Sequence, residues 1–141
     1  LIMLNYPRLH RRSVMIKKLS IVFGVVFLAV GILGFVPGVT TDKNGMDMLL
    51  GIFMVDATHN VIHILSGLLA LGASTKSQYA RLYFQGFGIV YAAVAIIGLI
   101  QKDTVLGLIH INAEDNILHV VLSVALLAIG FLYKESKTAT N

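Results

Sequence analysis

The stretch LGIFMVDATHNVIH, residues 50–63, returns later in the chain as LGLIHINAEDNILH, residues 106–119. In both copies a short apolar run leads into a polar cluster, and a long apolar segment follows. Upstream of each copy lies a second matching pair, FGVVFLAVGILG at residues 23–34 and FGIVYAAVAIIG at residues 87–98. The sequence therefore predicts two units of one design, each made of an apolar helix, an outer loop and a second apolar helix.

The composition indicates an integral membrane protein. Hydrophobic residues make up 57% of the 141 residues and charged residues 13%, and the mean hydropathy is +0.84, whereas soluble domains are about one quarter charged. Cysteine is absent, which excludes disulfides and thiolate metal sites. The Lys and Arg residues flank apolar runs and form no single patch, so we expect the lipid bilayer as a partner and no nucleic acid.

Four membrane spans are expected, at residues 19–36, 58–74, 82–100 and 116–133. Each is close to the minimum of about 17–20 residues that crosses a hydrocarbon core of about 30 Å. The predicted fold class is all-α, an integral membrane four-helix bundle built from two parallel helical-hairpin repeats. An even number of spans in each repeat gives both the same orientation, with a pseudo-twofold axis along the membrane normal.

The expected organisation has three parts. A basic cytoplasmic arm covers residues 1–18, the membrane bundle covers 19–133, and a polar cytoplasmic tail covers 134–141. Within the bundle, repeat one spans 19–74 and repeat two spans 82–133. The apolar runs at residues 49–55 and 105–111 are too short to cross a membrane, and we expect them in its outer interface.

The distribution of basic residues predicts the orientation. Nine Lys and Arg residues fall in the N-terminal arm, the loop at 75–81 and the C-terminal tail, against Lys43 and Lys102 in the outer loops. Cytoplasmic loops carry the excess of Lys and Arg. The chain is therefore expected in the cell membrane as a multi-pass protein with both termini in the cytoplasm.

The polar clusters contain good helix caps. Asp56 and Asn112 each precede an apolar helix, and both residue types are favoured at the N-cap because their oxygens accept from unpaired backbone N–H groups. A membrane helix that starts near the bilayer needs such acceptors.

Capping does not account for the deeper polar residues. Asn60 and His63 in the second span, and Asn116 and His119 in the fourth, each lie on one helical stripe with small residues. Polar side chains at such depth face the bundle interior and bond across helices. We expect a structural polar network of these four residues between spans two and four, with His63 near His119.

Two other functions stay open from the sequence. His59 and His63 share a helix face, as do Asp115 and His119, which suits a divalent metal; alternatively, haem b would need His63 and His119 alone. The other function is that of a small transporter or proton pathway, third after a structural role and metal or haem binding. The leading expectation is a non-enzymatic module with a structural or accessory role, without a cofactor, and capable of forming a homo-oligomer or joining a larger membrane assembly.

The segments HNVIHILSGLLAL, ARLYFQGFGIVYAAVAIIGL and LGLIHINAEDNILHVVLSVALLAIG carry a resemblance to a family. Over residues 19–133 the chain resembles the small four-span prokaryotic membrane proteins grouped as domain-of-unknown-function family 4383. The two N-x-x-H motifs, Asn60–His63 and Asn116–His119, are its most specific elements. The resemblance implies a four-helix bundle in the cell membrane and brings no activity. His59 stands where the second repeat has Asp115, which argues against two equivalent acid–histidine pairs.

Overall fold

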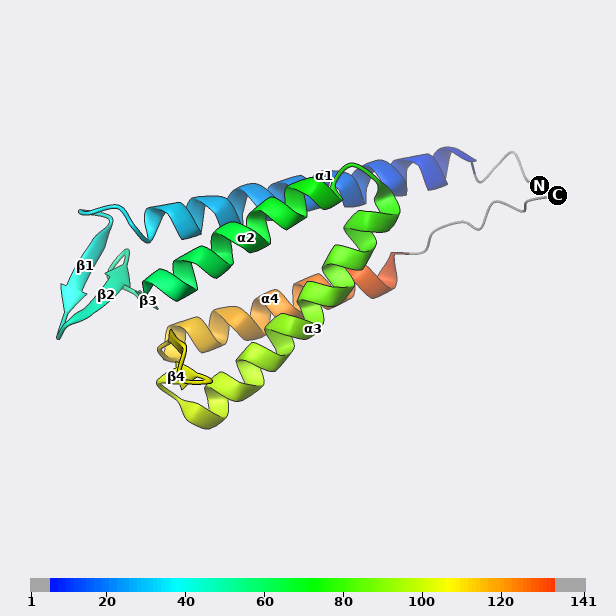
Figure 1. Cartoon of the computed structure of the whole chain (residues 1–141). Coiled ribbons are helices and arrows are strands. Elements are labelled where there is room, and N and C mark those ends of the chain that lie inside the picture. The colour runs from blue at the N-terminus through cyan, green and yellow to red at the C-terminus, as the bar shows by residue number, and fades with distance from the viewer. Residues whose placement is uncertain (1–5, 134–141) are drawn as a thin grey trace.

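The computed structural model describes the backbone of residues 6–133 and the side chains from Arg11 to Tyr133. The predicted polar tail, 134–141, and the first five residues of the predicted arm lie outside the described residues. Four helices form most of the fold: α1 (Tyr6–Leu33), α2 (Ala57–Ala73), α3 (Ser77–Gln101) and α4 (Ala113–Leu132). The start of α1, the α2–α3 turn and the end of α4 lie toward one end of the molecule, and the strands lie at the other (Figure 1).

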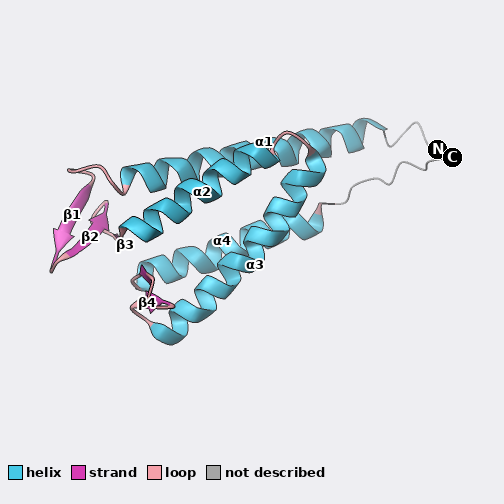
Figure 2. Ribbon diagram, in the orientation of Figure 1, coloured by secondary structure: helices cyan, strands magenta, loops and turns pink. Residues whose placement is uncertain are grey.

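The prediction of an all-α fold is correct for the helices, but it missed the five short strands that the described residues form in the loops after α1 and α3 (Figure 2). β1 (Thr40–Lys43), β2 (Met46–Leu49) and β3 (Phe53–Val55) form an antiparallel sheet, and β4 (Thr104–Val105) pairs with β5 (Ile109–His110). The apolar runs assigned to the membrane interface therefore contain strands.

The turns explain why these loops form hairpins. Asn44 and Gly45 join β1 to β2 with φ values of 59° and 82°, and Asn-Gly with positive φ is the strongest short signal of a β-hairpin. Leu50 and Leu106, at matching places in the two copies, also have positive φ, 54° and 55°, and a glycine follows each. The Asn44-Gly45 signal was present in the sequence, in a segment between two predicted spans that we expected to be a loop.

The helices pair in sequence order, α1 with α2 and α3 with α4. The contacts that hold each pair are alike. A Cβ on Gly34 would collide with Oδ1 of Asn60, and a Cβ on Gly98 would collide with Oδ1 of Asn116. These glycines let the start of one helix approach the end of the helix before it, because only glycine leaves room for the amide.

The two helix pairs meet through aromatic rings. Phe27 of α1 stacks on Tyr91 of α3 with ring centroids 5.5 Å apart, and Phe23 meets Phe84 edge-on at 5.4 Å. Phe27 and Tyr91 occupy equivalent positions in the two copies of the first repeated stretch. This stack forms one wall of the site described below.

Within the described part of the chain, three helical segments are long and apolar enough to cross a membrane: Arg11–Leu33, Ser77–Gln101 and Ala113–Leu132. α2 is apolar but has 17 residues, or about 26 Å at 1.5 Å per residue. The exposed large side chains of the helices are mainly Val, Ile and Leu, as expected for a surface that contacts lipid. The length and hydropathy of these helices are those of a membrane protein.

Candidate metal centre

The first turn of α2 is held by Asp56. Its Oδ1 accepts from the backbone N–H of His59 at 2.7 Å, and its Oδ2 accepts from the backbone N–H of His110 at 2.7 Å. The ring Nδ1 of His110 lies 3.0 Å from the same Oδ2. Asp56 therefore caps its own helix and fastens it to β5 of the other half of the chain.

The first turn of α4 is held in a reciprocal way. Asn112 and Asp115 form a capping box, and Oδ2 of Asp115 also accepts from the backbone N–H of Met54 at 3.0 Å. The side-chain amide of Asn112 donates to the carbonyl of Ile52 at 2.7 Å. Met54 and His110 occupy the same position in the two repeated stretches. Each donates its backbone N–H to a carboxylate in the other half of the chain, Met54 to Asp115 and His110 to Asp56.

The environment of Asp56 sets its charge. Partial burial alone would raise the pKa of its carboxyl group, but the hydrogen bonds from His110 and from the His59 backbone outweigh burial and hold the pKa below its ordinary value. The ionised carboxylate of Asp56 thus makes the contacts with His110 that join α2 to β5.

Three histidines meet below these caps. His59 and His63 come from α2 and His119 comes from α4, and a ring nitrogen from each lies within 4.8 Å of the others. Their ring centroids are 4.9 Å apart for His59–His63 and 5.8 Å for His59–His119. All three side chains are buried. The fold therefore gathers three imidazoles between the two helix pairs.

The nitrogens of this cluster are available to a ligand. The buried Nδ1 of His59, of His63 and of His119 each has no hydrogen-bond partner among the described residues. A buried polar group without a partner is costly and rare.

The predicted network residues fall into separate places. Asn60 and Asn116 turn their amide oxygens toward Gly34 and Gly98, and His63 and His119 lie in the histidine cluster. Among residues 11–133, no hydrogen bond joins either asparagine side chain to a histidine. Asp115, a predicted metal ligand, uses its Oδ2 for backbone N–H groups and does not belong to the cluster.

The space beside the cluster is small. A cavity of about 60 Å³ touches all three histidines and is otherwise lined by Ile62, Ser66, Phe87, Val90, Tyr91, Val94 and Ile109. Since a water molecule takes about 30 Å³ of the liquid, this space holds an ion with one or two small ligand atoms. It has no room for a porphyrin, so the arrangement does not fit haem b.

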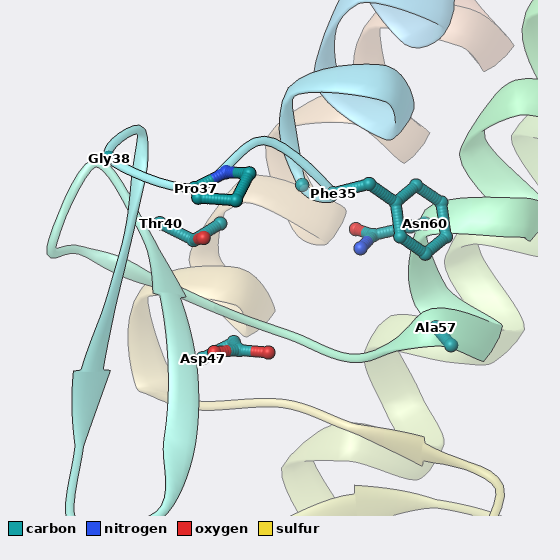
Figure 3. Close-up of a pocket in the computed structure, with 8 residues that line it drawn as sticks. Phe35, Pro37, Gly38, Thr40, Asp47, Ala57 and Asn60 are labelled. Carbon is teal, nitrogen blue, oxygen red and sulfur yellow. The ribbon is translucent and has the colours of Figure 1, made fainter.

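Larger hollows lie away from the histidines. One of about 430 Å³ opens between the end of α1, the β1–β2 hairpin and the start of α2, with Asn60 at its wall and Asp47 and Thr40 across from it (Figure 3). A second, of about 470 Å³, has Gly98 and Asn116 in the places of Gly34 and Asn60. Neither hollow is lined by a histidine of the cluster.

Sequence reasoning missed the aromatic wall of the cluster. Tyr91 lies 5.6 Å from His119 and 6.5 Å from His63 between ring centroids, and Phe27 lies 5.5 Å from His63. The repeat already aligned Phe27 with Tyr91. That alignment was the available signal, because the predicted pseudo-twofold relation between the repeats would bring equivalent residues together.

The chain matches a known protein family. The family model described as domain of unknown function DUF4383 matches residues 17–132. No curated protein and no solved structure shows significant similarity to the chain.

Proposed function

The chain belongs to the DUF4383 family, and from this premise we propose that it is a membrane protein that binds one first-row transition-metal ion through His59, His63 and His119. The observation that carries the proposal is the buried cluster of three imidazoles whose Nδ1 atoms lack partners. Haem is set aside because the adjoining cavity is too small for it.

The donor set indicates the class of metal. Imidazole suits Zn, Cu, Fe and Ni, whereas Mg and Ca prefer oxygen. Two ligands of a tetrahedral zinc ion lie about 3.3 Å apart for Zn–N bonds of about 2.0–2.1 Å. Ring nitrogens that already lie within 4.8 Å of one another reach this spacing by small side-chain rotations.

The proposed architecture around the ion is a four-span bundle of two parallel repeats. Three matched sets of contacts support it: Asp56 with His110 and Asp115 with Met54, and the two Gly–Asn contacts described above. The third set is Gly24 against Leu71 and Gly88 against Leu127. In this arrangement the ion would join the two repeats, since α2 supplies two ligands and α4 one.

We propose the cell membrane as the location, with both termini in the cytoplasm. The nine-to-two division of Lys and Arg supports this orientation. The histidine cluster then lies toward the outer face, because the helix starts that carry it adjoin the outer strands (Figure 1).

A structural or accessory role without metal is the second candidate function. The reciprocal links of Asp56 and Asp115 favour it, since they join the two halves by hydrogen bonds alone. A proton or substrate pathway would use the same histidines, so metal analysis separates both of these from the first proposal.

The test is metal binding by the purified protein in detergent. The chain is stripped with a chelator, equilibrated with Co²⁺ or Zn²⁺, freed of excess metal and analysed for metal content. We expect about one ion per chain in the parent and a large loss in His119→Gln, because an amide replaces imidazole poorly at a transition metal. His110→Gln, outside the cluster, is the control. A parent that retains no metal, or a His119→Gln variant that retains all of it, contradicts the proposal.

A further inference from the structure

We propose that the metal ion held by His59, His63 and His119 keeps one coordination position open to the adjoining cavity, and that one small monodentate ligand of two or three atoms binds there. The inference rests on the proposed function and deepens it, because it names the class of molecule that the site accepts.

The number of protein donors is the first step. Within the described side chains, the cluster of potential His, Cys, Asp and Glu ligands has three members. The nearest sequence candidate for a fourth, Asp115, bonds to the N–H groups of Met54 and Asn112. Zinc sites with a structural role have four protein ligands, whereas sites that act on small molecules have three and an open position.

The direction of the open position is the second step. Among the residues that line the cavity, His59 and His63 come from α2 and His119 comes from α4. α3 supplies Phe87, Val90 and Val94 to the same lining. None of these three side chains can ligate a metal. In the proposed complex, the vacant position of an ion on the three histidines points into this cavity, which all three histidines line.

The chemistry of the wall is the third step. Apart from the histidines, the lining is mainly aliphatic and aromatic, which favours weakly hydrated ligands over ions that need several hydrogen bonds. Ser66 uses its own hydroxyl hydrogen on the carbonyl of Ile62 at 2.7 Å. It therefore offers a ligand no free donor.

Tyr91 supplies the one hydroxyl of the wall that can turn toward a ligand. The residue is buried and lines the cavity. Its buried hydroxyl has no hydrogen-bond partner among the described residues. In the proposed complex the Tyr91 hydroxyl donates to the outer atom of the ligand, so Tyr91 is a specificity-determining residue and the histidines remain the metal ligands.

Size is the last step. A cavity of about 60 Å³ is about twice the share of one water molecule in the liquid. Azide, cyanide and diatomic molecules are small enough for a space of this size, and the ring of imidazole is bulkier than they are. The size of a ligand should therefore affect its binding at this site more than its intrinsic affinity for the metal does.

The experiment uses the full chain in detergent, loaded with Co²⁺, whose visible bands report its coordination. Azide is titrated into the parent, Tyr91→Phe, Val94→Phe and the control Val124→Phe, whose site of substitution is largely exposed on α4. We expect azide to shift the Co²⁺ bands of the parent and of Val124→Phe with one affinity. In Val94→Phe the shift should require at least about tenfold more azide, because the added ring fills the cavity.

The Tyr91→Phe variant and a titration with imidazole complete the test. Tyr91→Phe should bind Co²⁺ as the parent does and azide about fivefold more weakly, the equivalent of one hydrogen bond. Imidazole should leave the parent bands unchanged. Full Co²⁺ uptake with no response to azide would overturn the open position and leave the metal site standing. A parent that takes up no Co²⁺ overturns the metal site itself, and this inference with it.

Discussion

The backbone N–H of Met54 donates a 3.0 Å hydrogen bond to Oδ2 of Asp115, 61 residues further along the chain. The equivalent N–H of His110 donates to Asp56 at 2.7 Å. Each outer hairpin is thereby fixed to the helix start of the opposite half. These exchanged bonds hold the first turns of α2 and α4 side by side, which is what brings their histidines together.

Loss of the Asp115 carboxylate should weaken this exchange. We expect Asp115→Ala to lower the free energy of unfolding by about 1–3 kcal/mol, because the N–H groups of Met54 and Asn112 lose their acceptor. The measurement is denaturant unfolding in detergent micelles. Glu114→Ala, the adjacent exposed carboxylate, should unfold within about 0.5 kcal/mol of the parent. Equal losses in both variants would mean that charge at the helix start, and not the bond to Met54, is responsible.

The link made by Asp56 should depend on pH. Its pKa in the fold is lower than the ordinary value of 3.8, so its stabilising effect is complete above that value and is lost as the pH falls through the folded pKa. We expect Asp56→Asn to melt below the parent between pH 5 and pH 8, by a constant margin, on the order of a few degrees. The margin should shrink below about pH 3.8. Asp47→Asn, at an exposed position of β2, is the control. An equal margin at all pH values would refute the role of the charge.

Close helix packing should be sensitive to a single methyl group. A Cβ on Gly88 would lie 2.9 Å from the backbone nitrogen of Leu127, so Gly88→Ala should cost about 1–3 kcal/mol by overpacking. Gly86→Ala, two residues earlier with open space around it, should be neutral or stabilising because alanine favours a helix. Thermal melts of the two variants give the comparison. If both behave alike, α3 does not pack on α4 through Gly88.

Metal should stabilise the fold if the three histidines hold it. An ion that binds only the native state at 100 times its Kd adds about 2.7 kcal/mol to the free energy of unfolding. Melting of the chelator-treated protein with and without Zn²⁺ measures the change. The His63→Gln variant should lose most of this increment and His110→Gln should keep it. An increment that survives in His63→Gln would place the ion elsewhere.

The orientation can be read from single cysteines, since the chain has none of its own. Thr41→Cys in β1 and Gln78→Cys near the α2–α3 turn lie at exposed positions. We expect an impermeant thiol reagent added to intact cells to label the first and not the second. The reverse pattern would place the termini outside the cytoplasm.

The sequence by itself determined much that depends on local order. The apolar runs and their breaks set the four helices, and helical spacing put His59 and His63 on one face of α2, because 3.6 residues per turn fixes which side chains share a stripe. The motifs that suggested the family agree with the match over residues 17–132. Asp56 and Asn112 could be placed at helix starts because cap preference is a property of the residue and its neighbours.

Only the tertiary structure decided what meets across the two halves. Only the structure shows that Asp115 accepts a hydrogen bond from Met54 and that the Nδ1 atoms of three histidines have no partner among the described residues. It also shows that the cavity beside these histidines measures about 60 Å³. Spacing along one helix does not set its rotation or distance relative to another. Those depend on non-local packing, here the stack of Phe27 on Tyr91 and the contact of Asn60 with Gly34, in which the partners are far apart along the chain.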